Sequence, residues 1–173
     1  IDLGPLQPSL LTRLQTASGQ IEAAPDSMLK DLQRFADSLR QPAAEGQLLL
    51  IGRRHVRSNN SWMHNFQRLV KGKPRHQLLM HPDDMQQRQL VDGQRVSVRS
   101  RVAELQVMVT ASDAMMPGVV SLPHGWGHDR EGVQQDIARD HAGVSANDLT
   151  DERLVDAVTG NAAVNGVPIE VVA

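Results

Sequence analysis

Two polar, glycine-containing stretches of the sequence concentrate the side chains that could bind a ligand. The first covers residues 52–62 and places three arginines within five positions, followed by four short serine and asparagine side chains. Guanidinium groups make paired hydrogen bonds to phosphate oxygens, and a glycine lets the backbone approach a ligand closely. This stretch predicts a cradle for a pyrophosphate or a polar heterocycle, built from Gly52, Arg53, His55, Ser58, Asn59, Asn60 and Ser61. A solvated surface loop whose polar groups satisfy only their own backbone is the alternative interpretation.

The second stretch covers residues 122–128 and alternates glycines with ring-bearing side chains. Its glycines expose backbone amides, its indole offers a plane for stacking, and its imidazoles exchange protons near neutral pH. The residues that could contact a ligand are His124, Gly125, Trp126, Gly127 and His128. The four-residue spacing of the two histidines would suit zinc on a helix, but the glycines disfavour a helix and no third ligand is suitably spaced. A packed turn without a ligand is the other interpretation.

A third polar segment, residues 147–150, has the sequence Asn-Asp-Leu-Thr. This segment either caps a helix over residues 151–155 or supplies a polar contact to a ligand, in which case Asn147 is the candidate.

Common catalytic motifs are absent from the sequence. No Gly-x-Ser-x-Gly elbow places a nucleophile, and no Walker loop or helix-opening Gly-x-Gly-x-x-Gly is present. The chain has no cysteine, so it supplies no thiolate nucleophile, iron–sulfur ligand or cysteine-based zinc site. The sequence therefore predicts no catalytic residue and no metal ligand, and redox chemistry would have to come from a bound cofactor.

Short apolar runs separated by turn residues must position these loops. The runs lie at residues 48–51, 77–80, 96–98, 105–109, 119–122 and 167–172, and several alternate apolar with polar side chains as strands do. The unbroken first run predicts a strand that is buried on both faces. Pro82, followed by two aspartates, predicts a short helix. About six short strands with few helices predict a mainly β chain, folded as a closed β-barrel with short helices at its rim.

Residues 1–46 differ from the rest and predict a helical arm with a linker, ahead of a barrel domain over residues 47–173. A short helix is expected near Leu10, and a longer one is expected to be capped by Asp26 or Ser27 and stopped by Pro42. The apolar residues of the longer helix recur every three to four positions. This face packs either on the chain's own barrel or on a preceding domain.

Composition narrows the class of protein. The chain has 173 residues, is 40% hydrophobic and carries a formal net charge of -2, which argues against a generic nucleic-acid binder. No apolar run approaches the roughly 20 residues that a membrane-spanning helix needs, and no signal-peptide pattern is present. We therefore expect a soluble protein. The missing signal peptide carries no information if the true N-terminus lies upstream, so a cytoplasmic location is only the default. The start of the chain at Ile1 rather than Met suggests a fragment of a longer protein.

Taken in order, six motifs resemble the molybdopterin-dinucleotide-binding C-terminal domain of the dimethyl sulfoxide reductase family, which includes formate dehydrogenase-like and nitrate reductase-like members. They are residues 53–65, His81-Pro82-Asp83-Asp84, Asp92-Gly93, Pro117-Gly118-Val119-Val120, Pro123-His124-Gly125-Trp126-Gly127-His128 and Asn147-Asp148-Leu149-Thr150. The resemblance runs from about residue 48 to residue 172. The Asn-Asn-Ser-Trp and Pro-His-Gly-Trp-Gly-His pieces are its most specific parts.

The resemblance implies a double-psi β-barrel that closes over one side of a bis-molybdopterin guanine dinucleotide. The parent protein would be a molybdenum or tungsten oxidoreductase that carries out two-electron chemistry, with any iron–sulfur cluster in a preceding domain. Any protein ligand to the metal would also lie there, so the isolated domain is not expected to be catalytic. The first loop would approach the pterin and phosphates, with Trp62 packed beneath it, and the second loop would also face the cofactor. Asn147 would lie near the pterin or guanosine end.

The expected partners are the preceding domains of the same polypeptide and electron-transfer subunits, with no nucleic acid and no direct membrane insertion. Two other functions stay open at this point. One is a double-psi barrel that binds a peptide or protein without a cofactor. The other is an RNA-binding barrel that uses the basic residues between Arg53 and Arg75, although the chain has only four aromatic residues for base stacking.

Overall fold

A computed structural model describes residues 1–41, 44 and 46–173 of the chain. The chain divides into two compact units, Ile1–Pro42 and Ala43–Ala173. The predicted boundary lay between residues 46 and 47. Residues 42, 43 and 45, which belong to the predicted linker, lie outside the described residues.

The arm contains two helices, α1 (Leu10–Arg13) and α2 (Asp26–Ser38). The cap residue of α2 is Pro25, without a side-chain hydrogen bond, so the prediction that Asp26 or Ser27 caps this helix was wrong. Asp26 lies instead in the first turn, where a carboxylate suits the positive end of the helix dipole. The helix ends at Ser38, and Pro42, the predicted stop, lies outside the described residues.

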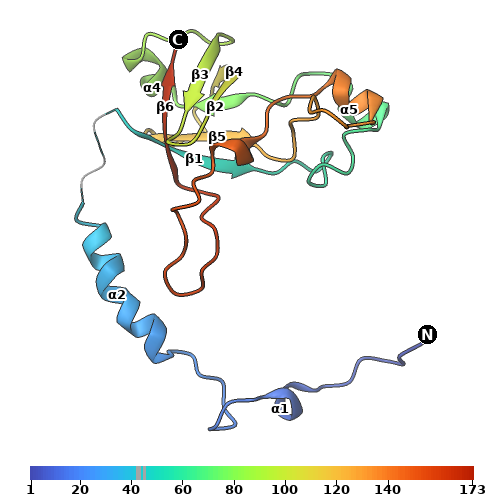
Figure 1. Ribbon diagram of the computed structural model, residues 1–173, viewed down its shortest axis with the longest axis vertical. Helices are drawn as coiled ribbons and strands as arrows, with labels where there is room; N and C mark the ends of the chain where they lie inside the picture. Colours follow the sequence, from blue (N-terminus) through green and yellow to red (C-terminus); the bar gives the residue numbers. More distant parts are fainter. Residues whose placement is uncertain (42–43, 45) are drawn as a thin grey trace. The chain divides into compact units, whose positions relative to one another are not determined.

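Residues 46–173 form a closed β-barrel (Figure 1). Its strands close in the order β1-β5-β2-β4-β3-β6, and the pairs β1–β5 and β2–β4 are parallel. The strands are β1 (Leu48–Arg53), β2 (Leu78–Met80), β3 (Arg95–Arg99), β4 (Glu104–Ala111), β5 (Val119–Pro123) and β6 (Val167–Val172). The prediction of a mainly β chain with a closed barrel is confirmed, because every predicted apolar run became a strand of it.

Short helices lie outside the strands: α3 (Gln67–Val70), α4 (Pro82–Gln87), α5 (Asp136–Asp140) and the 3₁₀ helix η1 (Ala146–Leu149). The sequence predicted only α4, because segments of four or five residues are too short to show a helical apolar period. Asp84 of α4 is buried, and its carboxylate accepts a hydrogen bond from the Gly118 amide at 2.8 Å, which holds the turn that enters β5. No helix among the described residues is long and apolar enough to cross a membrane.

The core fills the barrel with leucine, valine, isoleucine and methionine side chains from all six strands. In β1, Leu48 and Leu50 are buried, whereas Leu49 is 40% exposed and Ile51 is 36% exposed. The prediction that this strand is buried on both faces was therefore wrong. Successive side chains of a strand point to opposite faces, and only the inner face of a barrel wall is covered here.

Candidate functional site

The two predicted ligand-binding loops begin side by side because β1 and β5 are parallel neighbours. Arg53 at the end of β1 pairs in register with Pro123 at the end of β5. The chain continues from these strand ends into residues 54–66 and residues 124–135, and both segments leave the barrel on the same side (Figure 1). Carboxyl ends of adjacent parallel strands are a common place for ligand sites, since both loops there can contact one molecule.

A cavity of about 280 Å³ opens at these strand ends. It brings together four of the predicted site residues from three separate parts of the chain: Gly52, Asn60, His124 and Asn147. Its remaining lining residues are Leu50, Arg54, Ala146, Thr150, Val164 and Asn165. Both predicted loops therefore line the cavity, together with η1, Thr150 directly after it, and the turn that enters β6.

Asn60 and His124 form the polar centre of this cavity. The His124 Nε2 atom lies 2.5 Å from Asn60 Oδ1, and Arg54 Nη1 donates to the same oxygen at 3.3 Å. Because an arginine can only donate, the Asn60 atom that faces both groups is the oxygen, and the Nδ2 amide remains for a ligand. Burial and the Arg54 charge lower the pKa of His124, which favours its neutral ring. Because Asn60 Oδ1 can only accept, the His124 Nε2 donates this hydrogen bond.

Asn165 also lines the cavity, and sequence reasoning missed it. Its Oδ1 atom accepts a hydrogen bond of 2.7 Å from the Gly52 amide, which leaves its Nδ2 amide free. A Cβ at Gly52 would lie 3.3 Å from that oxygen, so glycine allows this close approach. The only sequence signal was Asn165-Gly166, a turn signature before the last strand.

The chemistry of the cavity is therefore that of a hydrogen-bond donor surface. The amides of Asn60 and Asn165 keep their N–H groups free, and the Asn147 side chain has no hydrogen-bond partner among the described residues. Arg54 adds a positive charge, and none of the described residues that line the cavity is an aspartate or a glutamate. Such a surface suits a ligand that is rich in acceptors, as a heterocycle with carbonyl groups or a phosphate is.

The first loop turns sharply at two consecutive asparagines in the left-handed region. Asn59 has a φ of 39° and Asn60 a φ of 65°, which asparagine tolerates better than most residues. Ser58 is buried, and its carbonyl accepts from the Met63 amide at 3.1 Å, while the Ser61 carbonyl accepts from His64. His55 is exposed and its Nδ1 accepts from the Arg57 amide at 3.1 Å. Of these predicted site residues, only Asn60 lines the cavity.

The second loop needs its two glycines for contacts as well as for conformation. Gly125 has a φ of 83°, and a Cβ there would lie 2.5 Å from the Asn60 carbonyl oxygen. Gly127 has a φ of 98°, and a Cβ there would lie 2.9 Å from the Ser145 Cβ. The absence of a side chain at Gly125 therefore lets the two loops contact each other closely. The absence of one at Gly127 lets the second loop pack against the segment that enters η1.

A cluster of rings lies behind the two loops. The ring centroids of His64 and Trp126 are 4.0 Å apart, and His64 Nδ1 lies 2.8 Å from His128 Nε2. The His76 ring also lies near the indole, with centroids 5.4 Å apart. His64 is 1% exposed, and its Nε2 is the one buried side-chain polar atom of the described residues without a hydrogen-bond partner. Sequence reasoning missed His64 and His76, which belong to no recognised catalytic pattern.

Trp126, and not Trp62, is the buried tryptophan of this site. Trp126 is 9% exposed, whereas Trp62 is 78% exposed. The expectation that Trp62 packs beneath its loop was wrong. The space behind the loop is filled by the His64 ring, which follows Trp62 by two residues and stacks against the indole of the other loop.

The histidine pair is not arranged as a metal centre. His124 contacts Asn60 in the cavity, and His128 is bonded to His64 in the ring cluster. In the part of the chain that the structure describes, no group of three or more metal-binding side chains is placed to hold an ion.

Arg53, a predicted phosphate contact, has its guanidinium bound to backbone carbonyls. It donates to Ser121 at 2.9 Å, to Gln77 at 2.8 Å and to Arg75 at 3.4 Å. These bonds tie β1 to β5 and to the segment that enters β2. Its predicted role in ligand binding stays a prediction, but its contacts here hold the barrel edge on which the site is built.

Replacing Arg53 by Met is therefore expected to lower the free energy of unfolding. The substitution leaves partly buried carbonyls without their charged donor, which costs about 2 kcal/mol. Denaturant unfolding of the chain would measure this loss, with the exposed Arg57→Met as the comparison in the same loop. An unchanged midpoint for Arg53→Met would contradict the structural role.

The structure around Asn147 disagrees with one of the two interpretations of residues 147–150, namely the helix cap. Residues 146–149 are themselves the 3₁₀ helix η1, and residues 151–155 form a turn and an isolated β-bridge, Val155 with Ala162. The interpretation that residues 147–150 cap a helix over residues 151–155 was therefore wrong. Asn147 lines the cavity instead, and its contact with a ligand stays a prediction.

Comparison with known proteins assigns this chain to a described family. The family model described as "Molydopterin dinucleotide binding domain" matches residues 48–168, which include the whole cavity. A tetrathionate reductase subunit from Salmonella typhimurium (strain LT2) is 26% identical over 121 residues, which cover 60% of this chain and 12% of that protein. Acetylene hydratase from Pelobacter acetylenicus shares the fold, with a TM-score of 0.58 and 17% identity, over 83% of this chain and 19% of that chain. The chain thus spans a small part of the length of either relative.

Proposed function

The chain belongs to the molybdopterin dinucleotide binding domain family, and we propose that it closes over one side of a bis-molybdopterin guanine dinucleotide in a molybdenum or tungsten oxidoreductase. The observation that carries this proposal is the donor-rich cavity at the carboxyl ends of β1 and β5. A pterin, a guanine and a pyrophosphate all present acceptor atoms, so the chemistry of the lining fits this group.

The residues that would hold the cofactor are those with free donors or with close backbone approach. The amides of Asn60, Asn147 and Asn165 would donate to ring carbonyl, ring nitrogen or phosphate oxygen acceptors, and Arg54 would bind a negatively charged oxygen. When bound, the cofactor supplies two-electron redox chemistry at its metal. The contribution of this chain would be to bind, orient and shield that group through the donors of the cavity.

The proposed parent protein is longer than this chain. The relatives above are several times longer than the segment they share with it, so the second wall of the cofactor site would come from other domains of the same polypeptide. Electron-transfer subunits are proposed as further partners. A barrel that binds a peptide without any cofactor is not favoured by the family match.

The direct test is metal and nucleotide analysis. The complete polypeptide that contains this chain would be purified without oxygen from a host that makes the cofactor. We expect molybdenum or tungsten together with GMP released by acid. A well-folded protein with neither metal nor GMP would contradict the proposal and favour the peptide-binding alternative.

The double variant Asn60→Ala with Ser61→Ala is expected to lower cofactor occupancy more than fold stability. It removes a cavity amide and the acceptor that orients His124. Occupancy should fall by about tenfold, as expected when a ligand loses about 1.4 kcal/mol of binding free energy. Released GMP per polypeptide would measure this, alongside thermal unfolding.

The matched control is Gln89→Ala. Gln89 has a φ of 56°, close to the 65° of Asn60, and is exposed outside the cavity, so an alanine there has the same left-handed conformation without loss of a cavity group. Full metal content and GMP in the Asn60/Ser61 variant would contradict the proposed role of this loop.

A further inference from the structure

The segment from residue 146 to residue 151 distributes its side chains with a spacing of three residues. Ala146 and Leu149 are buried, at 8% and 0% exposed, and belong to the barrel core. Asn147 and Thr150 line the cavity. The 3₁₀ helix ends at Leu149, and Thr150 follows it in extended backbone. Leu149 therefore lies in the core, Asn147 and Thr150 line the cavity, and Ala146 borders both.

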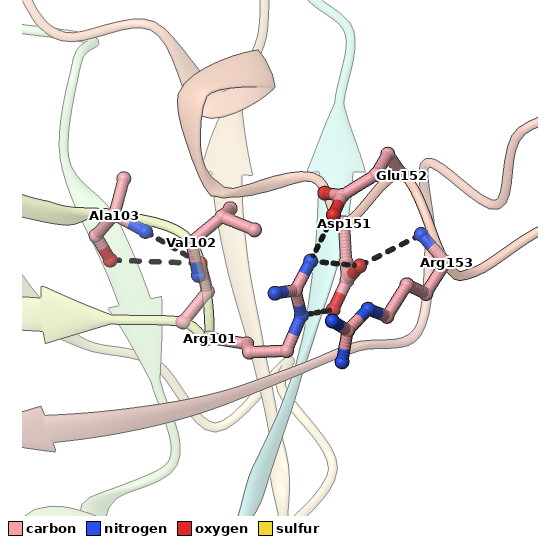
Figure 2. A network of polar contacts seen from close by, with 7 residues as sticks. Arg101, Val102, Ala103, Asp151, Glu152 and Arg153 are labelled. Atoms are coloured by element: carbon pink, nitrogen blue, oxygen red, sulfur yellow. Dashed lines mark hydrogen bonds and ion pairs between the residues drawn. The ribbon is translucent and has the colours of Figure 1, made fainter.

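The third pair, Asp148 and Asp151, binds two arginines that lie outside the cavity. Arg101 comes from the turn between β3 and β4 (Figure 2). Its Nε donates to Asp151 Oδ2 at 2.5 Å, and its Nη2 donates to Asp151 Oδ1 at 2.7 Å. Arg130, from the segment that follows the second loop, forms a hydrogen bond and an ion pair with Asp148.

The Asp151 carboxylate is the better fixed of the two aspartates. Besides the paired Arg101 bonds, its Oδ1 accepts from the Arg153 amide at 2.8 Å, and the Asp151 side chain is only 10% exposed. Arg101 also donates to Glu152 at 2.5 Å (Figure 2). The Arg101 hydrogen bonds hold the pKa of Asp151 at about 2. The paired hydrogen bonds of Arg101 therefore connect the β3–β4 turn to Asp151, which directly follows Thr150.

Within the segment itself, the Thr150 hydroxyl donates to the Asn147 carbonyl at 2.6 Å. The 3₁₀ helix is four residues long, and its cap residue Ser145 makes no side-chain hydrogen bond. Hydrogen bonds of 3₁₀ helices have poorer geometry than those of α-helices. One leucine and one alanine hold the inner side, and the two aspartates are the side chains of this segment that bind distant residues.

We propose that Arg101 and Arg130 are positioning residues, which bind Asp151 and Asp148 from outside and so keep the Asn147 amide and Thr150 turned into the cavity. Neither arginine lines the cavity. The proposal rests on the proposed function in one respect, namely that the oriented amide would contact the cofactor. Orientation by the arginines is a property of the chain itself and can be tested without any cofactor.

The first test uses the 173-residue chain with Arg101→Met. We expect faster hydrogen exchange across residues 146–151 and a changed NMR signal for the Asn147 side-chain amide, while the barrel strands keep their protection. Arg101→Lys retains the charge without the paired hydrogen bonds and should give an intermediate result.

The matched control is Arg99→Met. Arg99 lies beside the same turn and donates to Glu104 at 3.1 Å, so this change removes an exposed ion pair from the hairpin without touching residues 146–151. If Arg101→Met changes exchange at residues 146–151 no more than Arg99→Met does, the positioning role is overturned.

The second test measures released GMP in the complete polypeptide. Loss of an oriented wall should lower occupancy by about fivefold in Arg101→Met, in the range of changes seen when residues behind a ligand contact are removed, and leave Arg99→Met unchanged. GMP absent from the unsubstituted protein would contradict the proposed function, whereas the exchange experiment still decides the positioning role. GMP at the unsubstituted level in Arg101→Met would overturn the contribution of this pair to binding.

Discussion

Gly125→Ala is expected to separate the two loops of the site and to remove most cofactor binding. An added Cβ would lie 2.5 Å from the Asn60 carbonyl oxygen and 3.2 Å from the Ser61 amide nitrogen, so backbone has to move. The left-handed φ of 83° adds conformational strain. Together these effects should lower the free energy of unfolding by about 3 kcal/mol. Cofactor occupancy should fall by more than about tenfold, because the Asn60–His124 hydrogen bond joins these same loops.

Gly118→Ala is a closely matched control for Gly125→Ala. Gly118 also has a φ of 83°, but a Cβ there meets no atom within 4 Å. Both variants therefore have the same backbone strain, and only Gly125→Ala has the clash. Denaturant unfolding and released GMP would be compared between them. Equal values for the two variants would show that contact between the loops is unimportant.

Acidification from pH 7 to pH 4 is expected to destabilise the barrel domain through the ring cluster. Burial, with a smaller contribution from the His128 charge, lowers the pKa of His64 from its ordinary 6.5 to about 4. Burial also lowers the pKa values of His76 and His128. The folded state therefore keeps these rings neutral in a pH range where the unfolded chain would protonate them.

The direction of the effect follows from proton binding. Between pH 6.5 and pH 4 the unfolded state binds more protons than the folded state, so the free energy of unfolding rises with pH in this range. Stability is complete above the ordinary histidine pKa and is lost as the pH falls toward 4. The contribution of His64 to this loss is about 3 kcal/mol.

Denaturant unfolding at a series of pH values would measure the effect. His64→Phe keeps a ring against Trp126 but cannot bind a proton, so it should flatten the dependence between pH 6.5 and pH 4. His141→Gln changes an exposed histidine outside the cluster and should keep the full dependence. A His64→Phe variant with an unaltered pH profile would contradict this assignment.

The sequence by itself determined the strands of the barrel and where its loops begin. Alternating or continuous apolar runs have few ways to bury their side chains, so all six runs became strands, and Pro82 opened a helix as predicted. The two glycine-containing loops were also evident, because glycine, asparagine and arginine are unusual together directly after a strand. The family resemblance rested on these loops and agrees with the family that matches residues 48–168.

Only the tertiary structure decided which side chains of these loops face the cavity. Asn60 and His124 are 64 positions apart, and Gly52 and Asn165 are 113 apart, so their contacts exist only because the barrel closes with β1 between β5 and β6. The local pattern did not show that Arg53 binds carbonyl groups of neighbouring segments. The choice of the buried tryptophan likewise depended on a histidine from the other loop. Local propensity acts over a few residues, whereas the direction of a loop side chain is set by whatever distant segment packs against it.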